Sequence, residues 1–248
     1  MKSKSFLLPI LLLFFSPAKN KIKLWLIGDS TMSIKEVRAY PETGWGMPFV
    51  YFFDSTVTVE NRARNGRSTR TFISENRWKE VIENASEGDY IFIQFGHNDE
   101  VKEKVGSYTT PEEYKANLTR FVMEARSKKA IPILLTPVSR RNFDSAGRIK
   151  ETHLEYSGIV RNLARELSVS LIDHDKLSRE LLQQFGPENS KLLFLQLQPG
   201  EHPNYPDGKI DNTHFNELGA RKMAELVLAE IRKLQPELVE RIVVPKSK

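Results

Sequence analysis

The chain has 248 residues, 40% of them apolar, which is enough to bury one sizeable hydrophobic core. Its formal net charge of +5 is mild and no run of Lys and Arg resembles a nucleic-acid-binding arm, so we expect no nucleic-acid partner. There is no cysteine, which excludes disulfides, a thiol nucleophile and a cysteine-based zinc site.

The N-terminus has the pattern of a secretory signal peptide. Two lysines precede the apolar run Phe6–Phe15, and the small residues Ser16 and Ala18 follow it. A membrane-spanning helix needs about twenty apolar residues, so we favour cleavage after Ala18 over a membrane anchor. We therefore expect residues 1–18 to be removed and residues 19–248 to form one domain without a membrane span. The mature protein should be secreted or periplasmic, and the lack of cysteine favours a bacterial source.

Short apolar, β-rich segments alternate with helical patterns along the rest of the chain. The predicted strands are bounded by turn or charged residues, as buried parallel strands are: Ile22–Ile27, Thr56–Glu60, Tyr90–Phe95, Ile131–Thr136 and Val169–Ile172. Helices are predicted to begin at Pro111, with Thr110 as the cap, and to span Ile149–Leu167 and Glu217–Leu234. This alternation predicts an α/β sandwich around a parallel sheet, with the chemistry beyond the carboxyl ends of the strands.

The first predicted strand runs directly into Gly28-Asp29-Ser30-Thr31. A glycine before a serine lets the chain turn sharply and presents the hydroxyl at the rim of the sheet, with backbone N–H groups available to an oxyanion. An ordinary strand-end turn and a phosphate-binding turn are alternatives. The segment lacks the glycine spacing of a P-loop, of a dinucleotide fingerprint or of a G-x-S-x-G elbow. Alone, the motif only suggests a nucleophile at Ser30.

Two further strand ends carry candidate oxyanion donors. Gly66 follows the second predicted strand, and a glycine can adopt a backbone angle that aims its N–H into a site. Asn98 follows the third strand and can donate an uncharged side-chain hydrogen bond. Each residue is also credible as an ordinary turn residue.

A candidate base lies just before the last predicted helix, in Asp211-Asn212-Thr213-His214. A serine hydroxyl is a poor nucleophile until a base takes its proton, and a carboxylate on the other imidazole nitrogen fixes the tautomer of that base. Asp211 and His214 are three residues apart, so we expect both to come from one loop. A helix cap beside a surface histidine is the alternative for this pair alone.

Together these segments resemble the SGNH or GDSL hydrolase superfamily, whose four signature positions match Ser30, Gly66, Asn98 and His214 in order. The similarity extends to the rhamnogalacturonan acetylesterase branch through Gly28-Asp29-Ser30-Thr31, Gly66-Arg67-Ser68-Thr69-Arg70-Thr71-Phe72, Gly96-His97-Asn98-Asp99 and Asp211-Asn212-Thr213-His214-Phe215. The resemblance implies a flavodoxin-like, three-layer α/β/α sandwich with a five-stranded parallel sheet in the order 2-1-3-4-5.

The resemblance also implies an activity and a set of roles. It implies a serine esterase that removes O-acetyl groups from pectic polysaccharide, with no metal or organic cofactor. Ser30, Asp211 and His214 would be catalytic, and the oxyanion hole would consist of the backbone N–H groups of Ser30 and Gly66 and the amide of Asn98. His174, which lies between two aspartates and could imitate the catalytic pair, is then interpreted as structural.

Four arginines cluster around Gly66: Arg62, Arg64, Arg67 and Arg70. They could be solvated loop charges or a cradle for an acidic substrate. Arginine binds carboxylate in a planar, two-pronged contact, so Arg67 and Arg70 are our candidate contacts to the galacturonate units that the resemblance implies. Arg140 and Arg141, after the fourth strand, could add to them.

Two other functions fit the same fold. A lipase or thioesterase would need an apolar acyl groove beside Ser30. A non-catalytic carbohydrate-binding protein would have no need for a nucleophile and base, so the complete set Ser30, Asp211 and His214 argues against it.

Overall fold

The computed structural model describes residues 20–244. The signal peptide predicted for residues 1–18 lies outside the described residues. Within residues 20–244, none of the helices combines the length and the apolar character that a membrane span requires.

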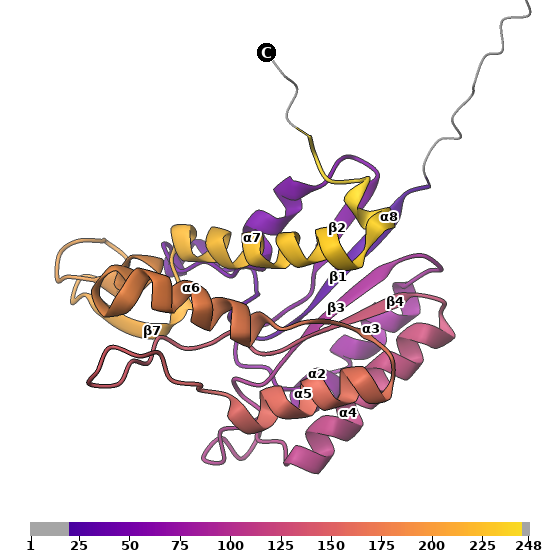
Figure 1. The fold of residues 1–248 in the computed structure, drawn as a ribbon, viewed down its shortest axis with the longest axis horizontal. Coiled ribbons are helices and arrows are strands. Elements are labelled where there is room, and N and C mark those ends of the chain that lie inside the picture. The colour runs from indigo at the N-terminus through magenta and orange to yellow at the C-terminus, as the bar shows by residue number, and fades with distance from the viewer. Residues whose placement is uncertain (1–19, 245–248) are drawn as a thin grey trace, which may run out of the picture.

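Strands and helices alternate along the chain (Figure 1). The strands are β1 (Ile22–Gly28), β2 (Val57–Asn61), β3 (Tyr90–Gln94), β4 (Ile131–Leu135), β5 (Ser170–Ile172), β6 (Phe194–Leu197) and β7 (Lys209–Phe215). The α-helices are α1 (Gly46–Phe49), α2 (Thr69–Ser74), α3 (Arg77–Asn84), α4 (Pro111–Ser127), α5 (Leu154–Glu166), α6 (His174–Asn189), α7 (Glu217–Leu234) and α8 (Pro236–Val239). The short 3-10 helices in the described part of the chain are η1 (Val37–Ala39), η2 (Val50–Phe52) and η3 (Ser190–Leu193).

The first five strands form one parallel sheet in the order β2-β1-β3-β4-β5, which confirms the predicted fold class and strand order. Gly28 at the end of β1 pairs with Gln94 at the end of β3. The segments that carry Ser30 and Asn98 therefore leave the sheet side by side. This register positions the candidate site.

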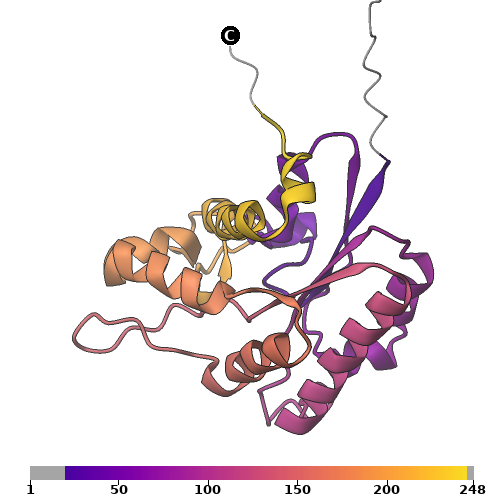
Figure 2. The same ribbon diagram turned by 45° about the vertical axis from the view of Figure 1, so that its right-hand side comes forward.

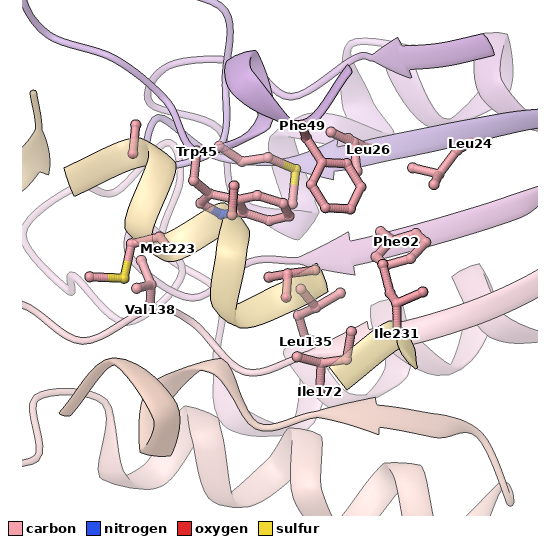
Figure 3. Close-up of a cluster of buried hydrophobic side chains, with 14 of the residues drawn as sticks. Leu24, Leu26, Trp45, Phe49, Phe92, Leu135, Val138, Ile172, Met223 and Ile231 are labelled. Atoms are coloured by element: carbon pink, nitrogen blue, oxygen red, sulfur yellow. The ribbon is translucent and has the colours of Figure 1, made fainter. Parts of the chain in front are cut away.

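The two faces of the sheet bury separate apolar clusters, and helices cover both (Figure 2). Along β1, Leu24 and Leu26 belong to one cluster and Trp25 to the other, as the alternation of side chains in a strand requires. Helices α6 and α7, orange and yellow in Figure 2, lie on one side, and α4 and α5 lie on the other. Figure 3 shows the first cluster, with Trp45, Phe49, Met223 and Ile231 packed over the strands.

Capping residues fix where two predicted helices begin. The Thr110 hydroxyl accepts from the Glu113 N–H at 3.2 Å, and Pro111 occupies the first position of α4, as expected. Helix α7 has the predicted bounds, and the Asn216 side chain accepts from the Gly219 N–H at its start.

One predicted helix is shorter than expected. The pattern favoured Ile149–Leu167, but α5 begins at Leu154. The preceding residues instead pair with a neighbouring segment, because Lys150 N–H donates to the Asn142 carbonyl and Phe143 bridges Ile149. Backbone groups already satisfied in this way do not join the helix.

Candidate active site

The turn that carries Ser30 is held by its neighbours. The buried Asp29 carboxylate accepts from both the N–H and the hydroxyl of Thr31, at 3.0 and 2.8 Å. Burial raises the pKa of Asp29, although the two Thr31 hydrogen bonds oppose that shift. The Thr31 hydroxyl also accepts from the Gln94 side chain at 2.9 Å, which ties the turn to β3. The Ser30 hydroxyl takes no part in these contacts.

Ser30, His214 and Asp211 form a continuous hydrogen-bonded chain. The Ser30 Oγ lies 2.9 Å from His214 Nε2, and His214 Nδ1 lies 2.8 Å from Asp211 Oδ2. The other oxygen of Asp211 accepts from the N–H groups of Thr213 and His214. Burial alone would raise the pKa of Asp211, but these hydrogen bonds from His214 and Thr213 hold it well below its usual range. The carboxylate is therefore ionised and fixes the orientation of the imidazole.

The expectation that Asp211 and His214 lie in a loop is wrong, because both lie on β7. This strand pairs antiparallel with β6 in a second, two-stranded sheet that the sequence patterns did not predict. The Gln196 side chain of β6 donates to the Asp211 carbonyl at 2.9 Å, and the Thr43 N–H donates to the Phe215 carbonyl. Contacts on both sides of β7 thus fix the positions of Asp211 and His214.

Gly66 and Asn98 line the same pocket as Ser30 and His214, an open pocket of about 420 Å³. Gly66 has a φ of +74°, a conformation that favours glycine. The Asn98 side chain is nearly buried, and its Nδ2 donates to the Arg67 carbonyl at 3.0 Å. An amide nitrogen has two hydrogens, so one is left to donate into the pocket.

Asp99, next to Asn98, holds the end of β3 to the start of α2. Its carboxyl group is fully buried and accepts from both the N–H and the hydroxyl of Thr69, at 2.9 and 2.6 Å. Burial raises the pKa of Asp99 to about 7, while the Thr69 hydrogen bonds oppose the shift. Asp99 therefore joins the two segments that carry Asn98 and Gly66.

Arg67 and Arg70 are engaged by carboxylates rather than pointing freely at the pocket. Arg67 pairs with Glu75 at 3.0 Å and Arg70 with Glu113 at 2.6 Å, and neither arginine lines the pocket. The cations that do line it are Lys104 and Arg140. Arg140 is itself paired with Glu100 at 3.2 Å.

Lys35 is a site residue that the sequence patterns did not reveal. Its nearly buried ammonium group donates to the Ser30 carbonyl at 2.6 Å and to the Asn65 side chain at 2.8 Å, and pairs with Glu42 at 2.7 Å. It links the serine turn to the segment that precedes Gly66. Burial lowers the pKa of Lys35, and the Glu42 carboxylate opposes that shift. A single polar residue after a turn carries no sequence signal for this position.

The buried histidines His174 and His97 take no part in the hydrogen-bonded chain. His174 contacts Gln94 Oε1 at 3.1 Å, and burial lowers its pKa to about 4. His97 lines the pocket, but its Nε2 lies 2.9 Å from the Val138 carbonyl, and burial lowers its pKa well below the usual range. Among residues 20–244, no group of three or more His, Asp or Glu side chains is arranged to hold a metal ion.

A hydrogen-bonded Ser-His-Asp chain beside free amide donors, at the carboxyl edge of a parallel sheet, defines a serine hydrolase. The chain belongs to the GDSL-like lipase/acylhydrolase family, which matches residues 26–222, and the protein is a serine esterase.

Two relatives and one solved structure show how close the similarity is. The chain is 43% identical to rhamnogalacturonan acetylesterase RhgT of Bacillus subtilis, covering 93% of this chain and 98% of that protein. It is 33% identical to the probable rhamnogalacturonan acetylesterase YesY of the same organism, covering 89% and 97%. The crystal structure of Bacillus subtilis YxiM is 27% identical with a TM-score of 0.73, and the similarity covers 88% of this chain but only 57% of that one.

Proposed function

We propose that the protein is a carbohydrate acetylesterase that removes O-acetyl groups from pectic polysaccharide by a Ser-His-Asp acyl-enzyme mechanism. The observation that carries the mechanism is the chain from Ser30 Oγ through His214 to Asp211, with both hydrogen bonds shorter than 3 Å. The test is labelling with a fluorophosphonate, which should modify Ser30 alone.

In the proposed mechanism His214 Nε2 takes the proton of Ser30 as Oγ attacks the acetyl carbonyl. The N–H groups of Ser30 and Gly66 and the amide of Asn98 stabilise the oxyanion. The protonated His214 then gives its proton to the departing sugar oxygen. Water hydrolyses the acetyl-enzyme with the same histidine as base, and the Asp211 carboxylate supports the charged imidazole in both steps.

Two observations support an acidic glycan as substrate. The relatives named above are rhamnogalacturonan acetylesterases. The residues of the described chain that line the pocket include Lys104 and Arg140 but no Asp or Glu. Arg140 is paired with Glu100, but Lys104 has no carboxylate partner in residues 20–244, and its charge favours a polymer that carries carboxylates close to its acetyl groups.

The charge of the substrate gives a direct prediction. Raising the ionic strength from about 0.01 M to 0.5 M should increase KM for acetylated pectic oligosaccharide several-fold, because salt screens an exposed charge attraction. KM for p-nitrophenyl acetate, which is neutral, should stay within about twofold. Initial rates of acetate release measure both values. If the enzyme prefers neutral acetylated xylan and its KM for pectic fragments is independent of salt, the pectic assignment fails and the acetylesterase chemistry stands.

A lipase or thioesterase activity is disfavoured by the polarity of the pocket. Of the described residues that line it, Val101 is the only aliphatic side chain, so a long acyl chain would find little apolar surface to cover. A non-catalytic carbohydrate-binding role would leave the fluorophosphonate unreacted, so the labelling experiment separates that role from catalysis.

We also propose that the protein acts outside the cytoplasm, because a polysaccharide substrate is not expected to enter the cell and residues 1–18 have the pattern of a signal peptide. The mature protein in its native host should begin at Lys19 and be recovered from the medium or periplasm. N-terminal sequencing measures this, and an intact Met1 on the mature protein would contradict it.

A further inference from the structure

Two of the three amide groups proposed as oxyanion donors, those of Gly66 and Asn98, have a cation on their carbonyl oxygen. Arg67 Nη1 donates to the Asn65 carbonyl at 3.0 Å, and the same peptide group carries the Gly66 N–H. Lys104 Nζ donates to Asn98 Oδ1 at 3.2 Å, and the same amide carries the Nδ2 hydrogens. Both cations therefore contact the acceptor end of a group whose donor end belongs to the pocket.

An amide N–H becomes a stronger donor when the carbonyl of the same amide accepts a hydrogen bond, because electron density shifts toward the oxygen. A cationic donor increases this effect. We propose that Arg67 and Lys104 are positioning residues that orient and polarise two of the three amides of the oxyanion hole, those of Gly66 and Asn98. The inference rests on the proposed function, which assigns Gly66 and Asn98 as oxyanion donors.

The contacts of Arg67 suit this role better than they suit the binding of a substrate carboxylate. Its Nε lies 3.0 and 3.1 Å from the two oxygens of Glu75, and its Nη2 lies 3.0 Å from one of them. The two-pronged face that would bind a galacturonate is thus occupied, and Nη1 is on Asn65. In addition, the Arg67 carbonyl accepts from Asn98 Nδ2, so Arg67 contacts the amide groups of both Gly66 and Asn98.

Lys104 is held in place by its own backbone. Its carbonyl accepts from the N–H groups of Ser107 and Tyr108, at 2.8 and 2.7 Å, and its N–H donates to the Val101 carbonyl. Its side chain forms no ion pair with a carboxylate in residues 20–244, and Asn98 is the partner of its ammonium group. The positive charge is therefore available to Asn98.

The experiment measures kcat and KM on p-nitrophenyl acetate, a neutral ester that has no carboxylate for a cation to bind. Arg67→Met and Lys104→Met should each lower kcat about fivefold to tenfold with KM within about twofold. This loss is smaller than the about 10²-fold or greater loss expected when a whole donor is removed. Lys104→Arg and Arg67→Lys keep the charge and should recover part of the rate. Matched controls are Arg77→Met, which removes the other arginine on Glu75, and Lys102→Met, on the same loop as Lys104.

A second measurement separates polarisation from support of the loops. An alkyl trifluoromethyl ketone accepts Ser30 Oγ at its carbonyl carbon, so that a C–O bond forms, the carbonyl becomes an oxyanion and the serine proton moves to His214. Its inhibition constant should rise in each variant by the same factor as kcat/KM falls. Three results would overturn the inference. In Arg67→Met and Lys104→Met, KM alone could change while kcat stays native, or the affinity for the ketone could be unchanged. Alternatively, the control variants could lose as much kcat as these two variants do.

Asn98→Ala distinguishes the failure of this inference from the failure of the proposed function. If Asn98→Ala lowers kcat about 10²-fold while Arg67→Met and Lys104→Met keep full kcat, only the polarising role is wrong. If Asn98→Ala keeps full activity, Asn98 is not an oxyanion donor, and both the proposed site and this inference fail. Thermal unfolding of every variant, followed by circular dichroism, excludes those that do not fold.

Discussion

Ser30→Ala should lower kcat by at least about 10³-fold on every ester substrate while the protein stays folded. The Ser30 hydroxyl contacts His214, whereas the turn around it is held by Asp29, Thr31 and the Ser30 carbonyl. Removing one oxygen should therefore remove the nucleophile and leave the turn in place. Rates of acetate release measure the loss, and the melting temperature checks the fold.

The matched control for this substitution is Ser74→Ala, which removes an exposed hydroxyl at the end of α2. It should keep the native rate and the native melting temperature. Mass spectrometry of the fluorophosphonate-treated protein should find the adduct on Ser30 and find none in Ser30→Ala. Near-native activity in Ser30→Ala, or an adduct on another serine, would show that Ser30 is not the nucleophile.

The central strands of the main sheet, β1, β3 and β4, could be predicted because they are buried on both faces. Such strands appear in the sequence as short, continuous apolar runs, and Ile91-Phe92-Ile93 is an example that belongs to β3. Parallel strands also bring their carboxyl ends to one edge, so residues far apart in sequence meet there. Ser30 follows β1 and Asn98 follows β3, and both line one pocket, whereas His214 reaches that pocket from β7, outside the parallel sheet.

The second sheet could not be predicted, because β7 lacks the alternation of polar and apolar residues that indicates a strand. Asp211, Asn212, Thr213 and His214 follow one another in it. Asp211 is used by His214, and the Asn212 side chain accepts from Gln196 and Arg141. The polar residues of β7 supply the acid and the histidine of the site. Because they are polar, hydrophobic periodicity does not indicate a strand at this position.

The ion-pair partners of Arg67 and Arg70 could not be predicted from the sequence either. Arg67 pairs with Glu75, eight residues away, whereas Arg70 pairs with Glu113 on a different helix. A long side chain can reach many groups, and the tertiary fold decides which of them is near. The sequence could therefore show that the cluster around Gly66 is basic, but not that these two arginines already hold carboxylates.

His214→Ala should lower kcat as severely as Ser30→Ala, and Asp211→Asn should lower it severely but less. Without His214 nothing takes the serine proton. Asparagine at position 211 would still accept from the backbone N–H groups of Thr213 and His214. Its NH₂ group would, however, face His214 Nδ1 and favour the tautomer with the proton on Nε2. That nitrogen could then no longer accept the proton of Ser30.

The measurement is kcat on p-nitrophenyl acetate for both variants. The control is His202→Ala, in the loop between β6 and β7, which should keep the native rate. If loss of His174 slowed the folded enzyme more than loss of His214, the base would be wrongly assigned.

The low pKa of Asp211 adds a test on stability. A carboxyl whose folded pKa is depressed contributes stability above its unfolded value, near 3.8, and that contribution is lost as the pH falls through the folded value. Unfolding titrations below about pH 4 should therefore show a shallower acid loss in Asp211→Asn than in the native protein. Equal slopes would mean that the Asp211–His214 contact contributes nothing to the folded state.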